Sequence, residues 1–259
     1  MSLKQEQDNT ALTLSEQEAK DLSKQYETFT PQDLLRWASE RFHPQITLAC
    51  SFGVEDVALI HMITQLQKKP RVFCLDTGRL HQETYEVMDQ IRSKYDIEIE
   101  IYFPNHEAVE KMVRAKGINL FYHSVENRHE CCGVRKVEPL GRALSGMQAW
   151  ITGLRRAQSM TRTSMSLLEI DAAHGRIAKI NPLIDWTGQQ VLDYVRTNHV
   201  PYNRLHDQGF PSIGCAPCTR AIKPGEDIRA GRWWWENPEN KECGLHVSSD
   251  RQRPISNKL

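Results

Sequence analysis

Five of the seven cysteines lie in segments rich in glycine, proline and charged residues, where thiols more often react or bind metal than pack in a core. Cys131 and Cys132 are adjacent, Cys215 and Cys218 form a CxxC pair, and Cys243 lies near the C-terminus. Thiolates are nucleophiles and soft metal ligands, so this set predicts metal binding, a reactive sulfur, or both. The odd number of cysteines argues against a disulfide framework.

The two cysteine pairs allow several interpretations from spacing alone. Adjacent cysteines can form a vicinal disulfide, which a reducing compartment disfavours, and a CxxC pair can be a redox motif. Together, four thiolates suit one metal site, either zinc or an iron–sulfur cluster. Zinc usually draws on CxxC-type pairs, whereas the side chains of adjacent cysteines diverge and reach two irons of a cubane more easily. The spacing therefore favours a [4Fe–4S] cluster and leaves zinc, or no metal, open.

Three polar segments are expected to follow strands at one edge of a sheet. They are CSFGVED at 50–56, LDTGRL at 75–80 and TGLRRAQS at 152–159. In an open α/β sheet, ligands bind beyond the carboxyl ends of the strands. Gly53 would let the backbone approach an anion, and the N–H groups that open the next helix would point toward it. Each segment alone is an ordinary turn, but together they predict a nucleotide phosphate site.

These segments depend on an alternation of strands and helices. A polar N-terminus of about 14 residues, expected to lack fixed structure, precedes two helices, the second opened by Thr30 and Pro31. Strands are expected at 46–50, 71–76, 97–103 and 149–153, a hairpin within 166–183, and helices at 54–66, 81–95, 105–116 and 187–199. Such alternation is typical of a parallel sheet with crossover helices.

We therefore predict an α/β fold with a parallel sheet and flanking helices. Residues 1–29 would form a polar segment and a helix, 30–200 a nucleotide-binding core, and 201–259 a loop-rich, cysteine-bearing segment with the CxxC pair. Cys50 and Cys74 lie in strand-like runs and are expected to be small core residues.

Charge and hydropathy exclude several classes of protein. With 33 basic and 33 acidic side chains the formal net charge is zero, so we expect no broad binding to nucleic acid or to an anionic membrane. No stretch approaches the ~20 consecutive apolar residues of a membrane span, and the N-terminus has no apolar signal-peptide core. We therefore expect a cytoplasmic protein.

Six segments resemble the assimilatory adenylyl-sulfate reductases, the bacterial, thioredoxin-dependent enzymes of sulfate assimilation. Along roughly residues 30 to 247 they are SFGVED, LDTGRLHQETY, HECCGVRKVEPL, WITGLRRAQS, GCAPCTRAIKPGEDIRAGRWWWE and KECGLH. The double cysteine, the CxxC pair and the ECGLH tail are the most specific features. The resemblance implies the adenine nucleotide α-hydrolase-like fold of the PP-loop superfamily. It also implies reduction of adenosine 5′-phosphosulfate to sulfite and AMP, a step toward cysteine.

The family's site residues carry over motif by motif. Cys243 matches the nucleophile, with His246 beside it, and its attack would give S-sulfocysteine and AMP. A thiol of thioredoxin or glutaredoxin would then release sulfite. The cluster ligands match Cys131, Cys132, Cys215 and Cys218. The residues expected at the substrate are Ser51, Phe52, Gly53, Asp56, Leu75, Thr77, Lys136, Gly153, Arg155, Arg229 and Arg232.

Departures from the family pattern and rival functions stay open. Gly133 stands where an arginine is expected after the double cysteine, so one local charge is missing. No thioredoxin-like domain follows Cys243, so we expect electrons from a separate protein.

Some cluster-bearing relatives also accept the 3′-phosphorylated substrate, which keeps a dual reductase open. A PP-loop ATP pyrophosphatase-type ligase is another alternative, although Phe52 and Glu55 depart from the glycine-rich SGGxDS loop, and an iron–sulfur sensor is a third.

Several residues also have purely structural interpretations. The run from Trp233 to Trp235 suits packing or a subunit contact better than a stacking platform for a base. Asp56 could support its own helix rather than touch a ligand, and Arg155 and Arg156 could be a solvated basic pair. A homo-oligomer is compatible with the sequence but is not predicted by any motif.

Overall fold

The structure is a computed structural model that describes residues 14–158, 163, 165–237 and 245. The expectation of an unstructured N-terminus falls on residues 1–13 and lies outside the described residues, as do the predicted nucleophile Cys243 and its neighbour His246.

A six-stranded sheet with the order β3-β2-β1-β4-β6-β5 forms the centre of the molecule. Its strands are β1 (Ile46–Ala49), β2 (Arg71–Leu75), β3 (Glu100–Tyr102), β4 (Ala149–Ile151), β5 (Leu168–Asp171) and β6 (Ile177–Ile180). All neighbouring strands are parallel except β5, which pairs antiparallel with β6 as the expected hairpin. The sheet is therefore mostly parallel, with one antiparallel strand at its edge.

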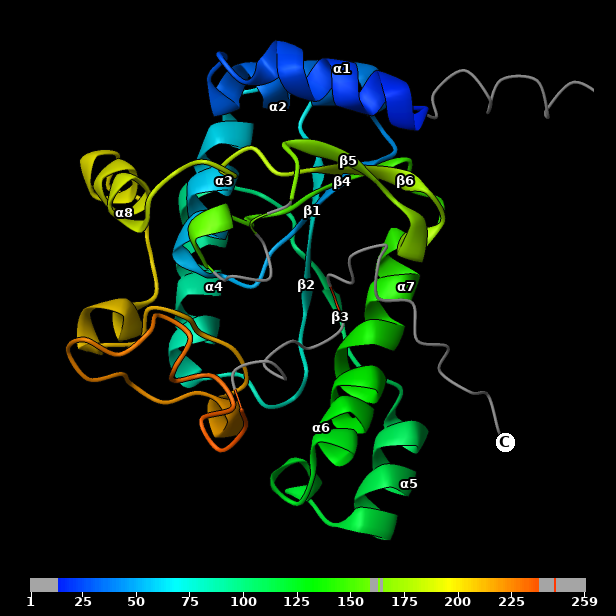
Figure 1. The fold of residues 1–259 in the computed structure, drawn as a ribbon, viewed down its shortest axis with the longest axis vertical. Coiled ribbons are helices and arrows are strands. Elements are labelled where there is room, and N and C mark those ends of the chain that lie inside the picture. The colour runs from blue at the N-terminus through cyan, green and yellow to red at the C-terminus, as the bar shows by residue number, and fades with distance from the viewer. Residues whose placement is uncertain (1–13, 159–162, 164, 238–244, 246–259) are drawn as a thin grey trace, which may run out of the picture.

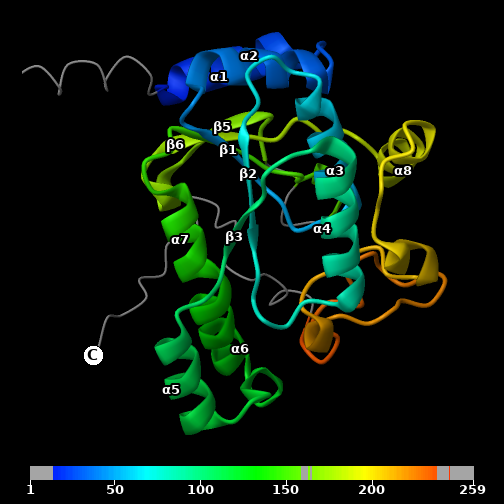
Figure 2. The same ribbon diagram turned by 180° about the vertical axis from the view of Figure 1, so that it is seen from behind.

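Helices cover both faces of the sheet (Figures 1 and 2). Helices α3 and α4 lie on one side and α7 on the other, while α1 and α2 cross one end. The helices are α1 (Glu16–Tyr26), α2 (Pro31–Phe42), α3 (Val54–Thr64), α4 (Gln82–Tyr95), α5 (His106–Lys116), α6 (Val125–Cys132), α7 (Glu138–Leu144) and α8 (Gly188–Thr197).

Local sequence explains where several helices begin. Ser15, Thr30 and Thr187 each cap a helix through a capping box, in which the hydroxyl accepts from the third backbone N–H of the helix. Pro31 occupies the first turn of α2, as expected. These local bonds mark the starts of α1, α2 and α8.

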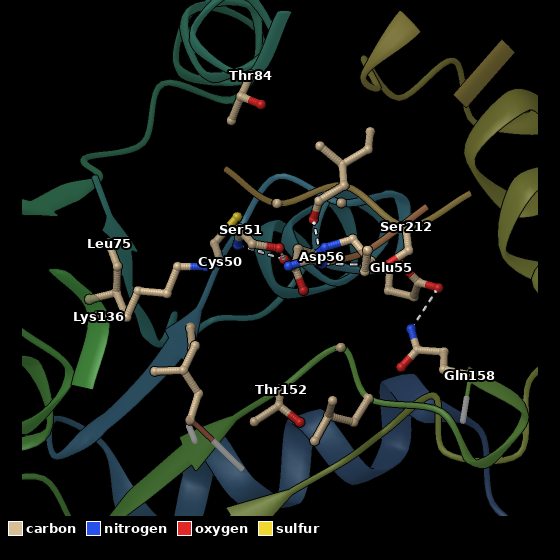
Figure 3. A pocket seen from close by; sticks show the side chains of 18 of the residues that line it. Cys50, Ser51, Glu55, Asp56, Leu75, Thr84, Lys136, Thr152, Gln158 and Ser212 are labelled. Carbon is tan, nitrogen blue, oxygen red and sulfur yellow. Dashed lines mark hydrogen bonds between the residues drawn. The ribbon is translucent and has the colours of Figure 1, made fainter. Parts of the chain in front are cut away.

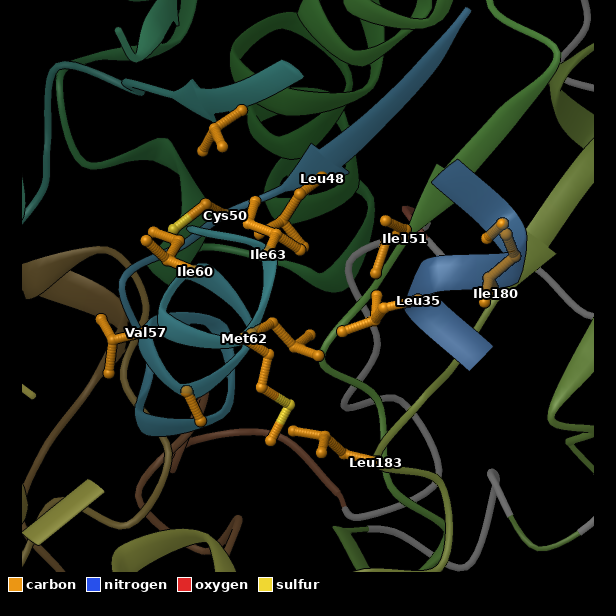
Figure 4. Packing of buried hydrophobic residues seen from close by; sticks show 14 of the residues in the cluster. Leu35, Leu48, Cys50, Val57, Ile60, Met62, Ile63, Ile151, Ile180 and Leu183 are labelled. Atoms are coloured by element: carbon orange, nitrogen blue, oxygen red, sulfur yellow. The ribbon is translucent and has the colours of Figure 1, made fainter. Parts of the chain in front are cut away.

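Helix α3 is the most deeply buried helix of the core (Figure 4). Val57, Leu59 and Ile60 are fully buried, because α3 packs against the sheet on one side and against α2, α4 and α8 on others. Cys50 and Cys74 belong to the same core at 4% and 1% exposure, which confirms their prediction as core residues. The N-terminus of this rigid helix therefore has a fixed position at the edge of the sheet.

The sequence analysis missed the helical segment from Val125 to Leu144. Helix α6 continues through a turn of π-helix, Gly133–Val137, into α7. The extra residue of a π turn shifts the helical period, so no single apolar stripe marks this segment. The one local signal is Ser124, whose hydroxyl caps α6 by accepting from the N–H of Asn127. The double cysteine thus lies at the C-terminal end of α6.

The strands are also shorter than predicted, most of all 97–103, which begins three residues later and of which only Glu100–Tyr102 pairs with β2. After residue 200 the described chain has two short 3-10 helices, Arg204–Gln208 and Ala216–Cys218, and is otherwise loop, as expected. None of the helices in the described part of the chain combines the length and apolar character needed to cross a bilayer.

Candidate active site

A cavity of about 230 Å³ lies at the carboxyl ends of β1, β2 and β4 (Figure 3). The loops after these strands line it together with parts of the segment after residue 200. The residues predicted from the sequence that line it are Ser51, Gly53, Asp56, Leu75, Thr77, Lys136, Gly153, Arg155, Arg229 and Arg232. The structure therefore brings together all the predicted substrate residues except Phe52.

The loop between β1 and α3 has a strained but buried turn. Phe52 adopts a φ of 59°, a left-handed conformation that costs a residue with a Cβ about 1–2 kcal/mol. Its side chain does not line the cavity as predicted, but is 1% exposed in the core, and this burial offsets the strain. The turn brings the N-terminus of α3 to the cavity, beside Ser51 and Gly53.

Asp56 stabilises this loop through hydrogen bonds to Ser51. Its carboxylate accepts hydrogen bonds from the Ser51 backbone N–H at 2.6 Å and from the Ser51 hydroxyl at 2.7 Å. Burial raises the pKa of Asp56 to about 6, and the bonds from Ser51 oppose that rise. Asp56 therefore has the supporting role considered from the sequence and also faces the cavity.

Gly153 allows the loop after β4 to pass against α3. A Cβ at this position would overlap the carboxylate of Asp56 and lie 2.9 Å from the Cβ of Glu55. Glycine is therefore the residue that lets these two loops meet, and the cavity floor depends on that contact.

Arg155 is not a solvated arginine. Its guanidinium pairs with Glu55 at 2.8 Å and donates to the Trp186 carbonyl oxygen, with only 8% of its side chain exposed. Gln158 also donates to Glu55 at 3.0 Å (Figure 3). The solvated pair considered from the sequence is thus excluded for Arg155, while Arg156 is more exposed and pairs with Asp185.

Basic side chains line the cavity both beside Glu55, where Arg155 lies, and opposite it. Lys136 enters beside Leu75, opposite Glu55 and Gln158 (Figure 3), and Arg229 and Arg232 also line the cavity. Arg232 is 7% exposed, and a Cβ on Gly214 would overlap its guanidinium. The cavity thus has a cationic part suited to an anion.

The four predicted metal ligands line a second, smaller cavity of about 20 Å³ beside the first. Its walls also carry basic and aromatic side chains, namely Arg79, Phe121, Arg128, Arg135, Lys136 and Trp233. Among the described residues no group of three or more His, Cys, Asp or Glu side chains is arranged to hold a metal ion. The donor set itself is four sulfurs within cationic walls, which fits an anionic cluster of iron and sulfide.

Thr77 joins the two cavities. Its hydroxyl lies 3.3 Å from the Cys215 sulfur, and its carbonyl oxygen accepts from Arg135 at 2.6 Å. Two residues further on, the carbonyl oxygen of Arg79 accepts a hydrogen bond from the Ala216 N–H at 2.8 Å. Burial acts to raise the pKa of Cys215, but Lys136 and Thr77 bring it below its usual value. The turn after β2 thus binds the CxxC segment to the nucleotide-side loops.

The tail returns to this cavity at Leu245. This residue lines the larger cavity and packs on an apolar cluster that includes Leu140 and Trp150. Leu245 lies between Cys243 and His246 in the sequence.

Comparison with known proteins identifies the family. The sequence profile of the phosphoadenosine phosphosulfate reductase domain matches residues 45–221, more than half of the chain. The chain belongs to the phosphoadenosine phosphosulfate reductase domain family. Within it, an adenosine 5′-phosphosulfate reductase of Allochromatium vinosum is 54% identical over 201 residues, which cover 78% of this chain and 78% of the relative.

Solved structures agree with this placement in the phosphoadenosine phosphosulfate reductase domain family. A phosphoadenylyl-sulfate reductase from Candida auris, crystallised with phosphate, has a TM-score of 0.70 and 30% identity and covers 81% of this chain and 98% of its own. An FMN adenylyltransferase from Candida glabrata, at 13% identity, has a TM-score of 0.54 and covers 95% of this chain and 83% of its own, and it supports the fold alone. The predicted nucleotide α-hydrolase-like fold is confirmed.

Three features of this family member were not found from the sequence. Glu55 neutralises Arg155, His206 lines the larger cavity, and Arg128 forms a buried ion pair with Glu236 at 2.7 Å. His206 had a weak local signal, since it lies in the polar segment Arg204–Gln208. The two ion pairs join residues about one hundred positions apart, so no local pattern could reveal them.

Proposed function

We propose that this chain reduces adenosine 5′-phosphosulfate to sulfite and AMP in sulfate assimilation. The observation that carries the proposal is that one cavity is lined by the α3 N-terminus, by four lysine and arginine side chains and by Leu245 of the ECGLH tail. The Allochromatium relative bears the name of this activity. The cavity offers cations for an anion. Burial raises the pKa of Cys50 and Cys74, the two core thiols that line it, so the tail thiol is the better candidate for a nucleophile.

In this proposal the substrate's phosphate and sulfate groups lie at the cationic part of the cavity. Lys136, Arg229 and Arg232 would neutralise them, and the N–H groups that open α3 would bind phosphate oxygens. Arg155 would contribute indirectly, because its ion pair with Glu55 holds the loop after β4 in place. The same cations would stabilise the negative charge that grows on the bridging oxygen as AMP leaves.

The chemical steps would take place on the tail. The Cys243 thiolate attacks the sulfur of the sulfate group, the bond from sulfur to the bridging oxygen breaks, and AMP leaves with that electron pair. The product is an S-sulfocysteine. A thiolate of thioredoxin or glutaredoxin then attacks the Cys243 sulfur and releases sulfite, and a second thiol of the donor closes its disulfide. His246 would support the thiolate of Cys243.

Cys131, Cys132, Cys215 and Cys218 would hold a [4Fe–4S] cluster. Bound there, the cluster would supply a compact charged centre that joins α6 to the CxxC segment. Lys136 lines both cavities, so it would balance negative charge on either side. The electrons for the reaction come from the donor thiols.

An intact-mass experiment tests the proposal. The protein is incubated anaerobically with adenosine 5′-phosphosulfate and without thiol, and a parallel sample receives the 3′-phosphorylated nucleotide. We expect one added SO₃ on Cys243, located by peptide mapping, together with AMP, and removal of the adduct by thioredoxin. A Cys243→Ser variant should form no adduct while it still binds AMP.

Each outcome decides between candidates. Equal adducts with both nucleotides would establish a dual reductase, which the name of the Candida auris neighbour makes a specific alternative. AMP formation that consumes ATP would support a ligase instead. A protein with intact iron and sulfide that forms no adduct with either nucleotide would contradict the covalent mechanism.

A further inference from the structure

Leu245 is the large aliphatic side chain nearest to Cys243 in the sequence of the tail. The stretch 236–246 reads ENPENKECGLH, and apart from Cys243 its other side chains are polar or charged, a glycine or a proline. Burial of a leucine is favourable, so an isolated leucine in a polar segment gains most from one apolar contact. The place where Leu245 packs therefore indicates where this part of the chain is held.

Leu245 packs against an apolar wall of the larger cavity. Leu140 and Trp150 belong to a buried cluster, Ala49 and Leu75 pack on the same cluster, and all four line the cavity. Leu245 also packs on this cluster, lines the cavity and is half-buried. Its contact is therefore with the wall of the cavity rather than with the outer surface of the protein.

The wall lies on the side of the cavity where Lys136 enters. Lys136 lies beside Leu75 (Figure 3), and Leu140 follows Lys136 by about one helical turn. Cys243 is two residues before Leu245, and two residues of chain span at most about 7 Å. A Leu245 held at the wall therefore limits how far the thiol can lie from the cation that would bind the substrate's sulfate group.

We propose that Leu245 is a positioning residue that anchors the tail on this apolar wall and so holds Cys243 near the sulfate group of the substrate. The inference rests on the proposed function, because it assumes attack by Cys243. Leu245 takes no part in the bond that forms or in the bond that breaks. Its packing reduces the freedom of the tail, so the thiolate meets the sulfur more often in the geometry that reacts.

Single-turnover formation of the S-sulfo adduct tests this role. Wild type, Leu245→Ala and Leu245→Met are mixed with saturating adenosine 5′-phosphosulfate without thiol, and intact mass gives the rate of SO₃ addition. Alanine removes most of the half-buried contact, so we expect the rate to fall about 10- to 100-fold. Methionine conserves apolar volume, so Leu245→Met should react at close to the wild-type rate.

Binding and stability measurements separate positioning from a structural role. The dissociation constant of AMP, measured by calorimetry, and the melting temperature should be the same in Leu245→Ala as in wild type, because the anchor acts on the tail. Leu22→Ala is the matched control, since Leu22 in α1 is also half-buried and packs on the main core but does not line the cavity. This variant should form the adduct at the wild-type rate.

Two results would overturn the inference alone. One is an unchanged rate of adduct formation by Leu245→Ala at saturating nucleotide. In that case weaker AMP binding would assign the leucine to nucleotide contact, and tighter binding would mean that it occupies the nucleotide's place. The other is a Leu245→Met variant as slow as Leu245→Ala, which would exclude an apolar anchor. Failure of the wild type to form any adduct would overturn the proposed function and this inference with it.

Discussion

Gly153 shows how closely a single residue controls this cavity. The loop after β4 passes the first turn of α3 with no room for a Cβ, because Asp56 and Glu55 occupy that space. Both carboxylates are fixed in turn, Asp56 by Ser51 and Glu55 by Arg155. A side chain at 153 cannot be accommodated by moving one flexible neighbour, so the backbone must shift.

We therefore expect Gly153→Ala to weaken AMP binding by at least about tenfold and to destabilise the fold by about 1–3 kcal/mol, as overpacking does. Gly141→Ala is the matched control, because a Cβ on Gly141 in α7 meets no atom within 4 Å. Alanine in that helix should leave binding unchanged and stability equal or slightly higher. Calorimetry and thermal denaturation of both variants measure this. Equal AMP affinity in the two variants would contradict the close contact.

At the scale of elements, α6 and the segment before the tail are joined by a buried stack. The Arg128 guanidinium lies over the Trp233 ring at 4.7 Å, and Arg232 lies over the same ring at 4.6 Å. Arg128 also pairs with Glu236 through two hydrogen bonds, with 0% and 2% of the two side chains exposed. This stack places the helix that carries the double cysteine against the segment that leads toward the tail.

Breaking one partner of a buried ion pair costs about 3–5 kcal/mol, because the other charge stays buried without compensation. We expect Arg128→Met and Glu236→Gln each to lower the unfolding free energy by about this amount. The double variant should be more stable than the sum of the two losses predicts. Denaturant titrations give the three values. Strictly additive losses would show that the two side chains do not interact.

The elements of this fold differ in how far the sequence could predict them. The loops after β1, β2 and β4 were predictable, because strand, turn and helix signals are local and parallel strands end at one edge. The helical segment 125–144 was not, because its π turn breaks the period. The ion pairs of Arg128 with Glu236 and of Arg155 with Glu55 were not predictable either. In the sequence these residues look like ordinary surface charges, and only the fold brings the partners together in a buried place.

At the scale of the whole molecule, the balance of 33 basic and 33 acidic side chains leaves no net repulsion near neutral pH. The change of stability with pH therefore depends on individual groups whose pKa values are shifted, several of them by burial. His61, His81 and His206 have pKa values lowered mainly by burial, so their contribution is lost as pH falls through the histidine range. The contribution of Asp56 changes in the opposite direction, because it is lost as pH rises.

Burial raises the pKa of Asp56 from 3.8 to about 6, so between these values the folded protein binds a proton that the unfolded chain does not. Its contribution is complete below about pH 4 and is lost as pH rises through 6. Asp56→Asn removes this titration while its amide oxygen can still accept from Ser51. We expect the melting temperature of Asp56→Asn relative to wild type to be highest near pH 7.5 and to fall steadily toward pH 5. Because the histidines are the same in both proteins, their effect cancels in this difference. A difference in melting temperature that stays constant across that range would mean that Asp56 is ionised throughout. The Ser51 N–H, which donates to its carboxylate, would then be what keeps it ionised.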